Sequence, residues 1–233
     1  SKLSQIMNKY LKSTIFRKAL AAISGLFLVT FLLGHLAGNL QLFIPGLEGQ
    51  TQFNKYALFM TTNPVVNVLS FLTYSSIILH ILLTIFLVIR SRKARPVQYQ
   101  VISNNSDVTW SSNNMTFLGV IIMLFIIVHM RSFWYEMHFG EIPYQLLSDG
   151  TKLKDLHTIT VSAFSNFWYS LFYVVCMFFL SMHLKHGIES SFQTVGIKFR
   201  KYQSIIKNGA LGVAILIPLI FASIPTYLYI IQK

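Results

Sequence analysis

Four histidines in this sequence lie inside long apolar runs, with one histidine in each of four successive runs. They are His35, His80, His129 and His183. An ionisable side chain is costly in a membrane interior, so it usually faces other helices and has a partner there. A single such histidine could simply hydrogen-bond to a neighbouring helix. Four in successive runs favour a shared role, because neutral imidazole is a common metal ligand.

The elements that must position these histidines are five stretches without Asp, Glu, Lys or Arg. Each stretch reaches the roughly 20 residues that span a bilayer as a helix, and only helices satisfy the backbone of such spans in lipid. The sequence therefore predicts an all-α integral membrane protein, with a single domain over residues 1–233 and a bundle formed by the first four helices. Placed on these stretches, the predicted spans are Ala19–Phe43, Val65–Ile89, Met115–Tyr135, Phe167–His186 and Gly209–Ile231; the third and fourth take in Arg131 and Lys185 near their ends.

The composition also favours a membrane protein. Of the 233 residues, 54% are hydrophobic and only 11% are charged, against about 25% charged residues in soluble domains. A net charge of +12 could indicate nucleic-acid binding, but the basic residues form short clusters between apolar runs, as in membrane topology. We therefore expect a lipid membrane as partner and no nucleic acid.

The basic clusters predict an orientation, because Lys and Arg collect on the cytoplasmic side. The N-terminus should be cytoplasmic and the C-terminus outside, in the cell inner membrane. The residues predicted to lie inside are Lys2, Lys9, Lys12, Arg17, Lys18, Arg90, Arg92, Lys93, Arg95, Lys185, Lys198, Arg200, Lys201 and Lys207. On the outside, the segment from Leu153 to Phe164 has apolar residues at helical spacing, which predicts an amphipathic surface helix.

Depth along each span sorts the four histidines into two levels. At a rise of 1.5 Å per residue, His35 lies about 24 Å from the inner end of its span, and His129 lies about 21 Å along an outward span. His80 and His183 lie about 22 Å and 24 Å along spans that run inward. His35 should therefore pair with His129 in the outer half, and His80 with His183 in the inner half.

Two facing histidines at each of two depths suit two haem groups, each with two imidazole ligands. Such haems have no open position for oxygen, so electron transfer is their natural role. Zinc or copper is less suited, because two histidines per level are too few ligands and no carboxylate or thiolate accompanies them. The single cysteine, Cys176, excludes covalent attachment through a two-cysteine motif, so we expect haem b.

Small and basic residues provide candidate haem contacts. Ser24, Gly25 and Gly119 fall at the inner level on spans that do not carry the inner pair; small residues there would admit a flat ring, or would simply let helices pack. Ser24 could donate to an inner propionate. Lys185 and Arg131 could neutralise propionates, although Arg131 could equally extend towards headgroups.

Several short motifs resemble the dihaem cytochrome b subunit (b558 type) of succinate:quinone oxidoreductases and fumarate reductases. The matching stretches are Gly25–Leu28, Phe31–His35, Arg90–Tyr99 and His183–Gly187 with Ser190. The resemblance covers nearly the whole chain, with five spans and one ligand in each of the first four. His186 competes with His183 on spacing alone. The resemblance selects His183, because the family's ligand precedes a glycine by four residues, and it implies the same pairing of levels.

The resemblance implies that the chain anchors a flavoprotein subunit and an iron–sulfur subunit on the cytoplasmic face. Electrons from succinate would pass through the inner and outer haems to a quinone, menaquinone in most members. The chain would thus be the quinone-reducing part of respiratory complex II, with succinate oxidation in the partner subunits. Candidate quinone contacts near the outer haem are Asn39, Gln41, Tyr56 and Trp134. For any one of them alone, an ordinary interfacial role is the simpler interpretation.

Two alternatives remain open. The chain could be the cytochrome b anchor of another membrane dehydrogenase, although bc-type cytochromes place two histidines on one helix and this chain has one per span. It could also be a non-haem transporter whose histidines relay protons. A transporter should be colourless and should carry an intramembrane acid, and the predicted spans contain none.

Overall fold

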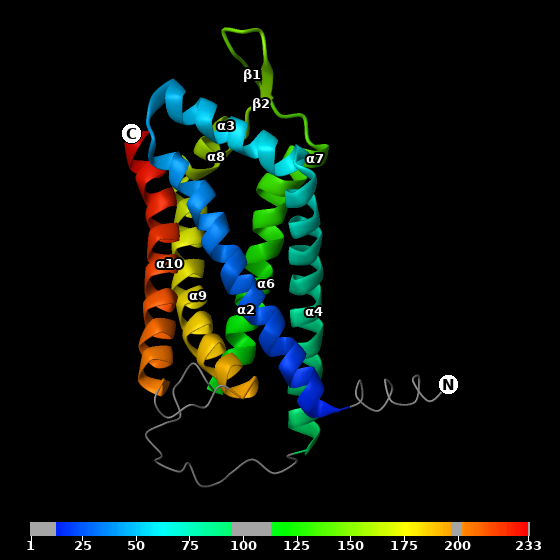
Figure 1. The fold of residues 1–233 in the computed structure, drawn as a ribbon. Helices are drawn as coiled ribbons and strands as arrows, with labels where there is room; N and C mark the ends of the chain where they lie inside the picture. The colour runs from blue at the N-terminus through cyan, green and yellow to red at the C-terminus, as the bar shows by residue number, and fades with distance from the viewer. Residues whose placement is uncertain (1–12, 95–112, 197–201, 233) are drawn as a thin grey trace, which may run out of the picture.

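The computed structural model describes residues 13–94, 113–196 and 202–232. Within these ranges, five helical segments are long and apolar enough to cross a membrane. Each runs from one end of the molecule towards the other, and α2 crosses the bundle obliquely (Figure 1). This confirms the all-α, five-span prediction. The main helices of these segments are α2 (Thr14–Asn39), α4 (Pro64–Ala94), α6 (Met115–His129), α9 (Phe167–Thr194) and α10 (Gln203–Ile231); the third segment continues from α6 to Phe139.

The helices extend beyond several of the predicted span ends. α4 continues past Ile89, α9 continues past His186, and α10 begins before Gly209. The predicted spans were limited to the length that crosses the lipid, but Lys, Arg and Glu are good helix formers, so a helix continues through them outside the lipid core. One consequence is that α9 carries Glu189. The statement that the fourth span lacks an acid therefore holds only for its predicted bounds.

The third span ends in a change of helical pitch. After α6, residues Met130–Trp134 form a π-helical turn (η2), which leads directly into α7 (Tyr135–Phe139). The first span also tightens at its end, into the 3₁₀ turn η1 (Leu40–Phe43). A 3₁₀ turn is frequent at the end of a helix, whereas a π-helical turn is uncommon and often occurs at functional sites.

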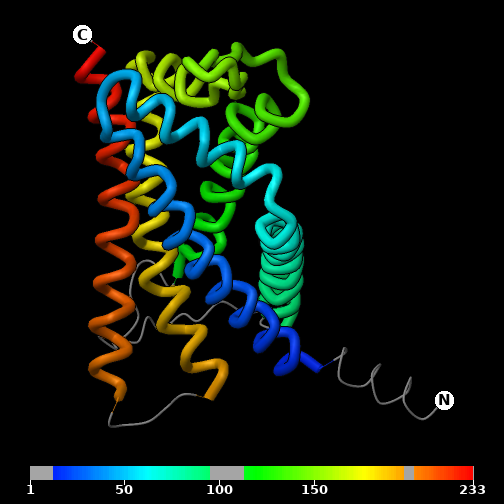
Figure 2. Tube along the Cα trace, turned by 45° about the horizontal axis from the view of Figure 1, so that its top comes forward, coloured from blue at the N-terminus to red at the C-terminus, as the bar shows by residue number. Residues whose placement is uncertain are grey.

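One end of the bundle is covered by a cap formed by α3 (Gly46–Thr62), α8 (Leu156–Phe164) and the hairpin of β1 (Tyr144–Leu146) with β2 (Lys152–Lys154). Figure 2 shows α3 and α8 lying across this end of the bundle. We call it the cap end; the opposite end, where α4 and α9 terminate, is the far end. The cap end is the side predicted to face outward, and α3 was not predicted from the sequence.

The predicted surface helix is confirmed only from Leu156 onward. Leu153 and Lys154 instead belong to β2, where Leu153 pairs with Gln145 in an antiparallel ladder. The helix starts later because Asp155 is its N-cap residue, with a side chain that accepts a hydrogen bond from the Thr158 N–H. A carboxylate in that position satisfies one of the free donors of the first turn.

A buried polar network holds the cap together. Asn54 is 1% exposed and its side-chain amide donates to Gln145 Oε1 at 2.9 Å and to Asp155 Oδ1 at 2.8 Å. Asp155 also accepts from Gln50 and from the Thr158 hydroxyl, both at 2.7 Å. Helices α3 and α8 and strand β1 are therefore joined by hydrogen bonds rather than by apolar packing alone.

In the bundle, α9 is the central helix, because α2, α6 and α10 all pack on it. Between α9 and α10, a core forms around Leu180, Leu184 and Ala214. α4 has its main contacts with α2 and with α3 in the cap. The four histidine-bearing helices are thus held together unevenly, and α4 stands at the edge of the group.

Some residues used in the sequence-based predictions lie outside the described ranges. They are Lys2, Lys9, Lys12, Arg95, Lys198, Arg200 and Lys201, together with the stretch from Arg95 to Tyr99.

The cap network makes a prediction about acid stability. Burial raises the pKa of Asp155, but hydrogen bonds from Thr158, Asn54 and Gln50 lower it by more, so the net pKa is below its usual value. A depressed pKa means that this stabilisation is present above the unfolded-state value of about 3.9 and is lost as pH falls through the lower folded-state pKa. At neutral pH, Asp155→Asn should lower the free energy of unfolding by about 1–3 kcal/mol. The new amide N–H₂ group is a donor, and it would face the donors of Asn54, Gln50 and Thr158.

Thermal unfolding in detergent and limited proteolysis of the cap would measure this cost. The matched control is Asp149→Asn in the exposed hairpin turn. This variant should unfold at the same temperature as the unmodified protein and should be cleaved at the same rate. Equal behaviour of the two variants would contradict the assigned role of Asp155.

Candidate functional site

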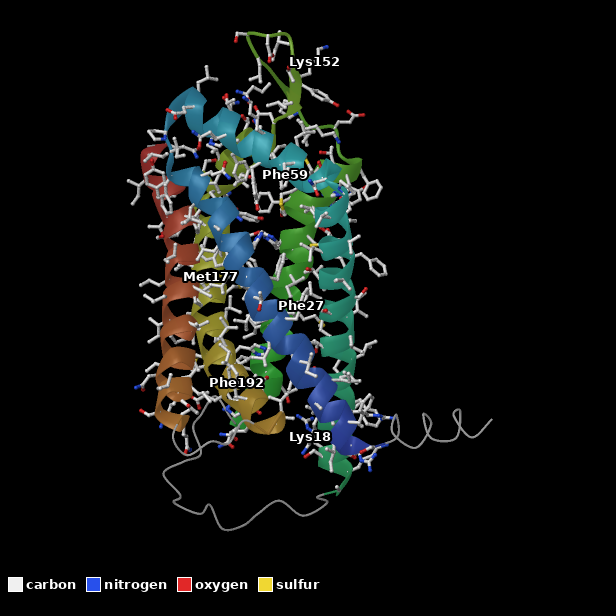
Figure 3. All side chains as sticks on the ribbon, viewed as in Figure 1. Lys18, Phe27, Phe59, Lys152, Met177 and Phe192 are labelled. Atoms are coloured by element: carbon white, nitrogen blue, oxygen red, sulfur yellow. The ribbon has the colours of Figure 1, made fainter. Side chains whose placement is uncertain are left out.

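A cavity of about 1050 Å³ runs along the inside of the bundle. Its volume reaches the upper limit of the roughly 300–1,000 Å³ found for sites that hold one drug-sized ligand. The wall is formed mainly by α2, α4, α6 and α9, with further residues from α3, η2, α7, α8 and α10, and it includes both Lys18 and Trp134. Lys18 lies at the far end, opposite the cap residue Phe59 (Figure 3). All four predicted ligand histidines line this cavity.

The two histidines predicted for the outer level lie next to each other at the cap end. The ring centroids of His35 and His129 are 5.7 Å apart, and the rings are nearly perpendicular, at 89°. When one metal ion holds an imidazole nitrogen on each side at about 2 Å, the two ring centroids lie roughly 6 Å apart. The observed separation therefore suits one metal between them. Aromatic rings surround the pair: Phe31, Phe125, Phe133, Tyr173 and Phe221.

The two histidines predicted for the inner level lie towards the far end. His80 on α4 and His183 on α9 both line the cavity and are close enough to interact electrostatically. His186, the competing candidate, also lines the cavity and interacts with His183. The structure thus brings His35 and His129 into ring contact. It places His80, His183 and His186 along the same cavity towards the far end, with both other histidines close enough to influence His183.

Hydrogen bonds engage one ring nitrogen in two of these residues. His80 Nδ1 lies 3.0 Å from the carbonyl oxygen of Ala21 and 3.2 Å from Ser24 Oγ. His129 Nδ1 lies 3.3 Å from Tyr173 Oη. In metal sites, the nitrogen that binds the metal is set by the hydrogen bond that the other nitrogen makes. In both residues, Nε2 is therefore the nitrogen left for a ligand.

The second histidine of the far-end pair, His183, has a ring nitrogen without a described partner. His183 Nδ1 is buried and has no hydrogen-bond partner among the described residues. A buried polar atom left unsatisfied costs about 1–3 kcal/mol. The ring therefore needs a ligand or a rearrangement to satisfy it.

Glycines lie opposite the far-end pair, as the sequence predicted. A Cβ on Gly25 of α2 would lie 3.1 Å from His80 Cε1, and a Cβ on Gly119 of α6 would lie 4.0 Å from His183 Cε1. Both glycines line the cavity. Any larger side chain at these positions would fill the space beside the histidine rings, so the glycines keep a space open at this level.

These features fit a planar macrocycle such as haem. Among the described residues, no group of three or more His, Cys, Asp or Glu side chains could hold a metal ion. Two imidazoles per level, with glycines and aromatic rings around them, are the surroundings that a haem with two axial ligands requires. The residues present therefore fit two such groups.

The remaining predicted contacts are divided between the cavity and the surface. Asn39, Tyr56 and Trp134 line the cap end, and Gln41 is not part of the lining. Arg131 pairs with Glu136 and stacks over Tyr135. Arg131 and Lys185 do not belong to the lining either. Their assignment as propionate partners stays a prediction.

Sequence reasoning missed residues that bear on the site, among them Lys18 and Tyr173. Lys18 lines the far end, although the sequence analysis used it only for topology. Lys18 precedes Gly25 by seven residues, about two helical turns, so a shared helix face was a signal that could have identified it. Tyr173 contacts His129, but nothing in its spacing distinguishes it from the other aromatic residues of α9.

Comparison with known protein families, curated proteins and solved structures finds no match for this chain. The functional argument therefore depends on the residues of the cavity and their geometry.

Two glycines of α2 give a matched pair of variants for the cap end of the cavity. A Cβ on Gly38 would overlap the ring and hydroxyl of Tyr56, whereas a Cβ on Gly34 would meet nothing within 4 Å. Gly38→Ala should therefore destabilise the protein by about 1–3 kcal/mol through overpacking. Gly34→Ala should be neutral or stabilising by up to about 1 kcal/mol, because alanine favours the helix.

Thermal unfolding of both variants in the same detergent would test this pair. An unchanged midpoint for Gly38→Ala would mean that α3 does not pack against α2 as described.

Proposed function

We propose that this chain is the membrane anchor and electron-transfer subunit of a succinate:quinone oxidoreductase and that it carries two b haems. The observation that supports it most is the arrangement of four histidines in one cavity, as His35 with His129 and His80 with His183. The choice of this enzyme family rests on the sequence motifs around His35 and His183. No dehydrogenase site is assigned to this chain; succinate oxidation belongs to the partner subunits.

The residues around each level have distinct tasks in this proposal. His35 and His129 would hold one haem at the cap end, and His80 and His183 would hold the other at the far end. Haem held in this way supplies one-electron transfer without an open position for oxygen. The Ala21 carbonyl fixes the ring of His80 by accepting from Nδ1, which selects Nε2 for coordination. Lys18 places a positive charge at the far end of the cavity, where a propionate would need one.

The orientation follows from the basic residues. We infer that the far end faces the cytoplasm, because Arg90, Arg92 and Lys93 end α4 there and cytoplasmic flanks are enriched in Lys and Arg. A flavoprotein and an iron–sulfur subunit would then dock at the far end. Electrons would enter beside His80 and His183 and leave beside His35 and His129, across the inner membrane.

The quinone, menaquinone by the resemblance, would accept electrons at the cap end. Asn39, Tyr56 and Trp134 line the cavity there. Burial raises the pKa of Tyr56, so its hydroxyl stays protonated at neutral pH and can donate a hydrogen bond to a quinone carbonyl. Trp134 already donates to Tyr74 Oη at 2.8 Å, so its contribution would be its ring face.

A transporter remains the second candidate because of one observation. Glu189 lies on α9 and its Oε1 is buried without a hydrogen-bond partner among the described residues. An acid of this kind is what a proton-relaying transporter would need. An absorbance spectrum separates the two proposals, because a transporter of this kind would show no haem bands.

Histidine variants test the haem assignment. The intact complex should contain two haems per chain. His35→Ala and His80→Ala should each remove one haem, because removal of one axial ligand leaves a single imidazole at that level. The matched control is His186→Ala, which should retain both haems although His186 lines the same cavity.

Haem is counted per chain as the pyridine complex, and co-purifying subunits are identified by mass spectrometry. A complex without haem would contradict the proposal. Two haems together with a different dehydrogenase subunit would support the assignment as a cytochrome b and would assign the chain to another enzyme.

A further inference from the structure

A chain of hydroxyl groups starts at the ring of His129 and continues along α9. Tyr173 Oη lies 3.3 Å from His129 Nδ1, and Tyr169 Oη lies 2.9 Å from Tyr173 Oη. Tyr173 is 6% exposed and packs between Phe125, Phe133 and Phe164. Its hydroxyl is thus a polar group in aromatic surroundings, and the two contacts to His129 and Tyr169 are its described hydrogen bonds.

The direction of this chain follows from the chemistry of imidazole. When Nε2 of His129 binds a metal, Nδ1 keeps its proton and can only donate. Tyr173 Oη must then accept from His129, so its own hydrogen is free to go to Tyr169 Oη. Hydrogen bonds that run in one direction polarise one another. Tyr169 therefore makes Tyr173 a better acceptor for the histidine.

Tyr169 connects this chain to the surface of the bundle. It is partly buried and forms one wall of a shallow groove between α6, α8 and α9, together with Ser132, Ser162 and Asn166. The second tyrosine of the hydroxyl chain therefore belongs to a groove that polar side chains also line at the cap end.

The far-end pair has a different kind of partner. His80 Nδ1 contacts the backbone carbonyl of Ala21, and that oxygen also accepts from Ser24 Oγ at 3.0 Å. A carbonyl group belongs to the backbone and no substitution removes it, whereas a single substitution removes the hydroxyl of a tyrosine. The two levels therefore differ in the group that accepts the proton of the ligand.

We propose that Tyr173, supported by Tyr169, is a positioning residue that fixes the ring of His129 and sets the reduction potential of the haem at the cap end. This inference rests on the proposed function. A histidine that donates to a good acceptor becomes a more basic ligand, and a more basic ligand favours the oxidised metal. The tyrosine pair lowers the potential of the cap-end haem and so sets the difference in potential between the two levels.

The test is a redox titration of the intact complex, with both haems followed by absorbance. Tyr173→Phe keeps the ring and removes the hydroxyl. It should retain two haems and raise one midpoint potential, with the other unchanged. The expected effect is a change of up to about tenfold in the relative affinity for the two oxidation states, which corresponds to about 59 mV for one electron. Tyr169→Phe should raise the same potential by a smaller amount.

A third tyrosine gives a matched control. Tyr227 lies at the cap end, and its hydroxyl donates to the carbonyl of Phe43 at 3.3 Å. Its hydroxyl therefore bonds to the backbone, whereas that of Tyr173 contacts a proposed ligand histidine. Tyr227→Phe should leave both potentials unchanged. If the phenol groups at this end had a purely structural role, the Tyr173 and Tyr227 variants would show equal shifts of the two reduction potentials.

The proposal is overturned if Tyr173→Phe contains two haems with unchanged potentials, or if both potentials move together. Should Tyr173→Phe fail to assemble, Tyr169→Phe carries the test, because a rise in one potential supports the proposal and no shift overturns it. A wild-type complex without haem would overturn the proposed function itself. The haem count therefore separates that failure from a failure of the tyrosine assignment.

Discussion

An imidazole ring inside a lipid-spanning bundle must satisfy two nitrogens where no water is present, and this constraint explains most of the site. A backbone carbonyl or hydroxyl satisfies Nδ1 in His80 and His129, which leaves the second nitrogen to face the cavity. His183 has a buried Nδ1 without a partner among the described residues. A polar atom left unpaired in such surroundings costs more than one in water. His183 therefore lacks the Nδ1 partner that His80 and His129 have.

The need for space between the histidines determines how the bundle is supported. Because α4 packs mainly on α2, a long cavity remains between it and the other helices that bear histidines. Close contacts elsewhere compensate: α10 packs along α9 around Ala210 and Ala214, and the polar network of Asn54 and Asp155 ties the cap together. The bundle therefore has a rigid side, formed by α9 and α10, and an open side, formed by α4. A cofactor that fills the cavity would contribute the packing that α4 lacks.

Sequence reasoning could predict the features that depend on hydropathy and helical rise. The five spans and the levels of His35 and His129 follow from these regularities, and Gly25 and Gly119 lie beside the far-end histidines as their spacing predicted. It could not predict α3, because that helix lies on the cap and mixes polar with apolar residues, nor the strand that replaces the start of the surface helix. Tyr173 was missed because its role depends on the rotation of α9 against α6, which only packing decides. The exposed position of Arg131 follows from its ion pair with Glu136, which spacing along a helix does not reveal.

The interleaved pairing of the helices has a consequence for how the chain matures. His35 on α2 meets His129 on α6, while His80 on α4 shares its level with His183 on α9. Neither pair joins neighbours in chain order, so a nascent chain with only its first two spans in the bilayer has no complete site. The cap-end site becomes complete with the third span and the far-end site with the fourth. Were the proposed haems bound at these two levels, their capture would be a late event in biogenesis, and a truncated translation product would lack the far-end site first.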